Sequence, residues 1–110
     1  MKIELLHIAD CPNTALALER VEGALAALGR DDVAVHLRLI ESAADTAGTG
    51  FAGSPTITAD GADIFPGGAP SSDLACRIYP TPGGHAGAPT VEQIVEALTG
   101  RGLTPSQKRR

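Results

Sequence analysis

A strand pattern, a helix pattern and a second strand pattern follow one another at the start of this chain, and this order restricts the folds that it can adopt. The apolar run at residues 3–8 predicts a β-strand. Leucine and valine then recur at helical spacing up to Gly29, a residue typical of helix C-termini, so a helix is predicted over 12–28. Residues 33–40 alternate with a period of two and predict a second strand. The short connections favour a right-handed crossover and two parallel strands, the basic unit of an α/β fold.

The second half of the chain predicts a β-hairpin and a final helix. Residues 55–59 and 62–65 are β-rich and flank Asp60-Gly61, a dipeptide that supplies the positive φ angles of a two-residue hairpin turn. The sequence Thr90-Val91-Glu92-Gln93 is a capping-box pattern, and it opens a helix predicted to stop at Gly100.

Less regular structure is predicted between and after these elements. Residues 42–50 have little apolar periodicity and predict a weak helical turn or a loop. Residues 66–89 are rich in glycine and proline, and predict a long loop with one short helix at 72–79. We expect one domain over residues 1–100 and a flexible tail over 101–110.

Cys11 is the main candidate for a reactive group because it lies between the first strand and the first helix. Free backbone N–H groups and the positive end of the helix dipole favour an anion there, so a thiol at this point should ionise readily. Pro12 suits the first turn of the helix, where no N–H group is needed. The alternative interpretation is that Cys11 is a small apolar residue that packs at the helix start.

Charge and composition exclude several classes of partner. The 110 residues carry a formal net charge of −4, and only 3% of them are aromatic. Nucleic acid and anionic membranes are therefore poor partners, and a stacking platform for bases is not expected. The sequence shows no leader peptide and no membrane span, so we expect a cytoplasmic protein whose two cysteines are reduced or redox-active thiols.

The chain resembles the thioredoxin fold in its element order and in two sequence positions. Cys11 matches the attacking cysteine of that fold, and Ser54-Pro55-Thr56 resembles its cis-proline loop, which lies against the sulfur. Thr14 stands where dithiol members carry their second cysteine, so Cys-Pro-Asn-Thr is a monothiol version of their motif. The resemblance covers residues 1–65 and 90–100. It implies a three-layer fold: a mixed four-stranded sheet, helices on both faces, and a long Gly/Pro-rich loop before the last helix.

The same resemblance implies roles for individual residues. A cis Pro55 would leave a backbone edge beside Cys11 free to pair with an extended substrate, which makes Ser54, Pro55 and Thr56 candidate substrate-binding residues. Without the resemblance, a trans bond would be expected before Pro55. Thr14 would donate a hydrogen bond from its hydroxyl group to a Cys11 thiolate and so lower the pKa of Cys11, or it would only begin the helix.

A narrower resemblance connects the chain to small bacterial thioredoxin-like proteins named alkylmercury lyase. It is carried by four segments, which are 51–57, 60–61, 74–79 and 80–84. Organomercurial lyases use two cysteines and an aspartate. Cys11, Cys76 and Asp10 offer those groups here, without a matching motif.

Cys76 allows two interpretations. It would resolve a sulfenic acid or mixed disulfide formed at Cys11, or share a soft metal with it, if the Gly/Pro-rich loop folds back over the site. Otherwise it would be a buried residue on one face of a short helix that includes Leu74 and Ile78.

Three functions follow as hypotheses. The first is a thiol protein in which Cys11 attacks a disulfide, peroxide or electrophile, carried by a small molecule or a protein, with Cys76 as the resolving thiol. The second is binding of mercury or copper(I) by Cys11 and Cys76, or an activity like that of alkylmercury lyase. The third is a scaffold without thiol chemistry. No cofactor is predicted, the histidines show no zinc-ligand spacing, and the sequence specifies no oligomeric state.

Overall fold

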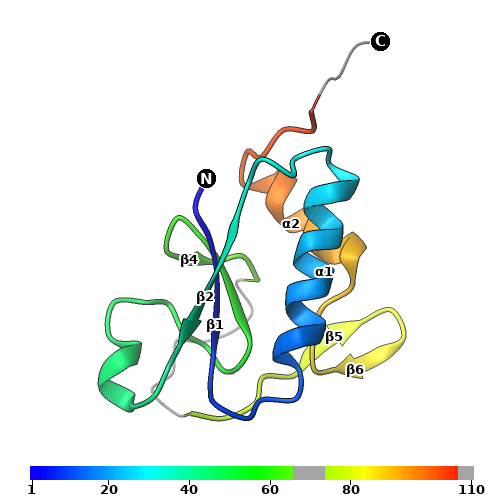
Figure 1. Cartoon of the computed structure of the whole chain (residues 1–110). Coiled ribbons are helices and arrows are strands. Elements are labelled where there is room, and N and C mark those ends of the chain that lie inside the picture. Colours follow the sequence, from blue (N-terminus) through cyan, green and yellow to red (C-terminus); the bar gives the residue numbers. More distant parts are fainter. Residues whose placement is uncertain (66–73, 107–110) are drawn as a thin grey trace.

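The predicted β-α-β unit is present, and its two strands are parallel. In the computed structural model, which describes residues 1–65 and 74–106, β1 (Ile3–His7) pairs in parallel with β2 (Val35–Leu39). The helix α1 (Thr14–Ala27) connects them and lies against the sheet (Figure 1). The strand and helix predictions for the first forty residues are confirmed, with boundaries shorter by one or two residues at most ends.

The predicted hairpin completes a mixed four-stranded sheet. The strand β3 (Thr56–Ala59) runs antiparallel to β1, and β4 (Ala62–Asp63) runs antiparallel to β3, which gives the strand order β2-β1-β3-β4. Asp60 and Gly61 join the last two strands with φ angles of 51° and 86°. Both angles are positive, as a two-residue hairpin turn of this kind requires.

The last helix, α2 (Val91–Gly100), begins with the predicted capping box. The Gln93 N–H group donates to the Thr90 hydroxyl at 3.1 Å, and the Thr90 N–H group donates to the Gln93 side chain at 2.9 Å. Two backbone donors that the helix itself cannot satisfy are therefore paired. No helix in the described ranges has both the length and the apolar character needed to cross a membrane.

Both α-helices lie on one face of the sheet, so the prediction of helices on both faces is wrong for the described residues (Figure 1). Their buried side chains join those of β1 and β3 in the main core; the largest are Ile3, Leu5, Val21, Ile57, Ile94 and Leu98. The opposite face carries a smaller cluster of Leu6, Ile40 and Phe51. The only helical element between β2 and β3 is a 3-10 turn at Ala43–Thr46, because residues 42–50 lack the apolar stripe that would anchor a helix to the sheet.

The predicted short helix at 72–79 is wrong over 74–79, and residues 72–73 lie outside the described ranges. Residues 74–78 form no helix and contain one isolated β-bridge, at Cys76. The strands β5 (Tyr79–Thr81) and β6 (Gly84–Ala86) form a separate antiparallel hairpin. Leu74 and Ile78 are exposed, so the apolar face that suggested a helix has no core to bury it. The hairpin lies near the N-terminal end of α1 (Figure 1).

The segment expected to be a flexible tail begins with packed residues. Leu103 is only 4% exposed and belongs to the main core. The Ser106 N–H group donates to the Leu28 carbonyl at 2.8 Å, and the Arg30 guanidinium donates to the Thr104 carbonyl. Residues 101–106 therefore cover the C-terminal end of α1.

Replacing Ile57 by Ala should lower the free energy of unfolding by about 2–5 kcal/mol, because Ile57 is fully buried where β3 meets both helices. Replacing Leu37, which is 53% exposed on the outer strand β2, should change it by no more than about 0.5 kcal/mol. Urea unfolding of the two variants tests this placement of the core. Equal losses for both variants would contradict it.

Candidate functional site

Cys11 lies in the connection between β1 and α1, as predicted from the sequence. The chain leaves β1, turns at Asp10 with a φ of 58°, and reaches Cys11 before the helix begins at Thr14. The Thr14 N–H group donates to the Cys11 carbonyl at 3.3 Å, so the first turn of the helix forms directly at this residue. Asp10 is exposed and Cys11 is half-buried, so Cys11 is partly accessible from solvent.

The surroundings of Cys11 lower the pKa of its thiol. Partial burial by itself raises that pKa, but four hydrogen-bonding groups around the sulfur more than offset it. In order of their effect these are the Ser54 hydroxyl, the Asn13 N–H group, and the hydroxyl and N–H groups of Thr14. The favoured state of the sulfur is thus shifted towards the thiolate, which is the nucleophilic and metal-binding form.

The Ser54 hydroxyl is the strongest of these groups, and its orientation is fixed by the residue that follows β1. Its oxygen accepts a hydrogen bond from the Ile8 N–H group at 3.1 Å. A hydroxyl group has one proton and can accept at its lone pairs, so the proton of Ser54 is free to point at the Cys11 sulfur. Ser54 itself is completely buried.

The Thr14 hydroxyl is a weaker partner. Its oxygen is buried and has no hydrogen-bond partner of normal geometry among the residues that the structure describes. It nevertheless lies near enough to the sulfur to lower the pKa of Cys11. The predicted contact between Thr14 and the thiol is therefore present as a secondary one, behind that of Ser54.

The peptide bond between Ser54 and Pro55 is cis, as the resemblance implied. Pro55 and Thr56 are fully buried. The Thr56 hydroxyl donates to the Gly53 carbonyl and accepts from the Ala52 N–H group at 3.0 Å, so it stabilises the turn. Of the three residues predicted to bind substrate, only Ser54 has a side chain that reaches the thiol.

The backbone of Ser54 is already paired within the chain, which overturns the expectation of a free edge beside Cys11. The Ser54 N–H group donates to the Ala75 carbonyl, and the Arg77 N–H group donates to the Ser54 carbonyl, both at 2.8 Å. These bonds place Cys76 directly opposite Ser54 in a short parallel bridge. Paired residues in such a bridge extend their side chains to the same side.

The structure thus brings both cysteines to Ser54, one through its side chain and the other through its backbone. Cys76 is exposed, so its interpretation as a buried residue in a short helix is wrong. Both cysteines are free thiols. Cys11 is the half-buried member of the pair, and the hydrogen bonds around it lower the pKa of its thiol.

An arginine that the sequence did not single out holds this bridge in place. The Arg77 guanidinium forms an ion pair with Asp63 at 2.7 Å and donates to the Phe65 carbonyl at 2.9 Å, with its side chain only 8% exposed. It also lies 4.6 Å from the centre of the Tyr79 ring. A side chain at Gly53 would come within 2.9 Å of the Arg77 Cβ, so the loop approaches closely only because residue 53 is glycine.

Tyr79 connects the same segment to the proline loop. Its hydroxyl donates to the Pro55 carbonyl, and its ring meets Phe65 edge to face. Burial raises the pKa of this phenol far above its usual range; the nearby Arg77 cation opposes the rise and the Asp63 carboxylate adds to it. The group therefore stays neutral and keeps its proton for the hydrogen bond.

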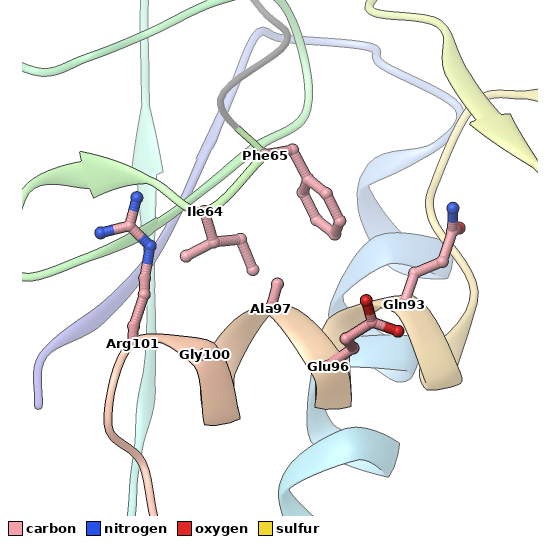
Figure 2. Close-up of a pocket in the computed structure, with 7 residues that line it drawn as sticks. All are labelled: Ile64, Phe65, Gln93, Glu96, Ala97, Gly100 and Arg101. Carbon is pink, nitrogen blue, oxygen red and sulfur yellow. The ribbon is translucent and has the colours of Figure 1, made fainter.

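A surface hollow lies away from the two cysteines. Figure 2 shows it between the end of the β3–β4 hairpin and α2, lined by Ile64, Phe65, Gln93, Glu96, Ala97, Gly100 and Arg101. Neither Cys11 nor Cys76 contributes to it. The thiol site is instead defined by hydrogen bonds and by the bridge at Ser54.

Metal binding by a larger cluster finds no support in the described part of the chain. No three His, Cys, Asp or Glu side chains there are grouped to hold an ion. A soft metal bound by two thiolates would need only Cys11 and Cys76.

Comparisons of the chain with family models, with curated proteins and with solved structures find no match.

Replacing Ser54 by Ala should raise the pKa of Cys11, because the variant lacks the strongest hydrogen bond to the thiolate. Ultraviolet absorbance of the thiolate against pH, measured in a Cys76→Ser background, reports Cys11 alone. The rate of alkylation should follow the same curve, rising with pH through the Cys11 pKa and moving to higher pH in the variant. Ser42→Ala, at the residue before the 3-10 turn, serves as the control; identical curves for all three proteins would contradict the assignment.

Replacing Tyr79 by Phe should remove a pH dependence of stability at alkaline pH. In the native protein the phenol keeps its proton above about pH 10, where the unfolded chain loses it, so stability is full below that pH and falls above it. At neutral pH the variant should be less stable by about 1 kcal/mol, for the lost hydrogen bond to Pro55. Unfolding curves at several pH values test both effects, and the near-ultraviolet spectrum follows the phenol directly because Tyr79 is the one tyrosine in the sequence.

Proposed function

We propose that this chain is a thioredoxin-like thiol protein of a reducing compartment such as the cytoplasm, in which Cys11 is the nucleophile and Cys76 the resolving thiol. The observation that carries the proposal is the lowered pKa of Cys11 in contact with Ser54. A thiol that only packs at a helix start would need neither a hydroxyl donor nor partial exposure. The mixed four-stranded sheet and the position of Cys11 before α1 support the fold assignment.

The proposed reaction with a disulfide has two steps. The Cys11 thiolate attacks one sulfur of the substrate, a bond forms between the two sulfurs, and the substrate's other sulfur leaves as a thiolate. The Cys76 thiolate then attacks the Cys11 sulfur and releases the second thiol of the substrate. The substrate disulfide is reduced by two electrons, and Cys11 and Cys76 are oxidised to a disulfide.

Peroxide would enter the same scheme. The Cys11 thiolate takes one oxygen and becomes a sulfenic acid, and a hydroxide ion leaves. The Cys76 thiol condenses with the sulfenic acid to form the disulfide and releases water. The position of Cys76 opposite Ser54 supports a resolving role, since Ser54 also contacts the attacking sulfur.

A second candidate function is favoured by the same arrangement of the two cysteines around Ser54. Two thiolates suit mercury(II) or copper(I), and no turnover is needed for binding. In a reaction like that of alkylmercury lyase, the carbon of an organomercurial would gain a proton and leave as a hydrocarbon, while both thiolates kept the mercury. The exposed Asp10, next to Cys11, is the carboxyl group available to donate that proton.

Intact mass after mild peroxide treatment tests the first candidate. The reduced protein should lose two hydrogens within one chain, and either Cys11→Ser or Cys76→Ser should abolish the loss. The Cys76→Ser variant should instead gain one oxygen at Cys11. Oxygen gain at Cys11 in the native protein, without loss of hydrogen, would remove Cys76 from the mechanism.

The same two variants separate the candidates. Mercury(II) held against a competing small thiol by the native protein, and lost from both variants, would favour the binding function if peroxide forms no internal disulfide. Unreactive thiols in both experiments would contradict both candidates.

A further inference from the structure

The residues that pair with Ser54 occupy the backbone groups that an incoming peptide would need. An extended peptide binds to a strand edge by donating to and accepting from a free backbone N–H and C=O pair. At Ser54 both groups are used, by Ala75 and by Arg77. We call residues 75–77 the covering segment.

The covering segment is anchored by contacts that do not involve either sulfur. Arg77 is held by Asp63 and by the Phe65 carbonyl, and Tyr79, two residues further on, is held by Pro55. The ion pair is largely buried, with 8% of the Arg77 side chain and 12% of the Asp63 side chain exposed. Removing one partner of such a pair leaves a charge without compensation, so the segment is held firmly against the loop.

Cys11 nevertheless remains half-exposed. A small disulfide or electrophile needs only a path to the sulfur, whereas a polypeptide that docks as a strand also needs the Ser54 backbone. With a free Ser54 edge, the site would accept both small molecules and extended polypeptides. With the covering segment in place, it accepts only the small molecules.

We propose that the covering segment restricts the Cys11 site to low-molecular-weight thiols, disulfides and electrophiles, and prevents recognition of extended polypeptides at Ser54. This inference rests on the proposed function of Cys11. In the first step a bond forms between the Cys11 sulfur and the substrate sulfur, the substrate S–S bond breaks, and the leaving sulfur departs with the electron pair as a thiolate.

Two disulfides with the same leaving group test the inference. One is 2-hydroxyethyl disulfide. The other is an uncharged extended peptide of about ten residues, long enough to form a β-strand, whose cysteine is joined to 2-mercaptoethanol. The measured quantity is the ratio of the two second-order rate constants, peptide over small disulfide, for formation of the mixed disulfide at Cys11. The ratio should be low in the native protein and rise roughly tenfold in Arg77→Ala, the factor that matches recovery of one or two backbone hydrogen bonds.

Two further variants and one physical measurement complete the test. Asp63→Asn should raise the ratio in the same direction as Arg77→Ala, and Arg30→Ala, which removes an ion pair with Asp32, should leave it unchanged. Hydrogen exchange of the Ser54 and Arg77 amides in the native protein should be slow, and the peptide should not alter it. If the Arg77 variant does not fold, hydrogen exchange in the native protein tests whether the covering segment keeps the Ser54 backbone paired.

The outcomes distinguish the inference from the proposed function. Equal rates for the two probes in the native protein, or fast exchange of the Ser54 and Arg77 amides, would overturn the covering role and leave Cys11 as the nucleophile. If Cys11→Ser reacts as fast as the native protein with both probes, the proposed function itself fails.

Discussion

Ser54 is hydrogen-bonded through its N–H group, its carbonyl and its hydroxyl, and these bonds join three separate parts of the chain. The hydroxyl accepts from Ile8, the residue after β1, and donates towards Cys11, while the backbone pairs with residues 75–77. Because Ser54 is completely buried, each group would carry a desolvation cost if it lost its partner. Ser54 therefore has little freedom to shift relative to β1, to the Cys11 thiol or to the covering segment.

The sheet determines where this residue lies. Antiparallel pairing aligns Leu6 of β1 with Thr56 of β3, so the end of β1 and the start of β3 are adjacent. Cys11 comes shortly after the end of β1, and Ser54 comes shortly before the start of β3. A change of one residue in this register would reverse the faces of β3 and move Ile57 out of the core. The packing of the core and the position of the thiol thus depend on the same alignment.

Local sequence signals were sufficient for the first strands, both helices and the position of Cys11, because each depends on neighbouring residues. Asp60-Gly61 predicts its turn through backbone preference alone, and Thr90 with Gln93 predicts a helix start. The bridge at Ser54 joins residues twenty or more positions apart and leaves no pattern in either segment. The helix predicted at 72–79 is absent over its described part because the spacing of Leu74 and Ile78 is that of a buried helix face, whereas both side chains are exposed. The spacing of Asp63 and Arg77 in the sequence does not predict their ion pair.

The surroundings of Cys11 favour the step that returns its oxidised form to the free thiol, which is the reverse of the attack on a substrate disulfide. Hydrogen bonds from Ser54, Asn13 and Thr14 stabilise the Cys11 thiolate, but they gain far less from a neutral disulfide sulfur. Stabilising the reduced form in this way makes the disulfide form the stronger oxidant. A disulfide between Cys11 and Cys76 would therefore be reduced readily by small thiols, which need no strand edge to reach it. The lowered pKa and the covered backbone of Ser54 thus favour the same class of reaction partner.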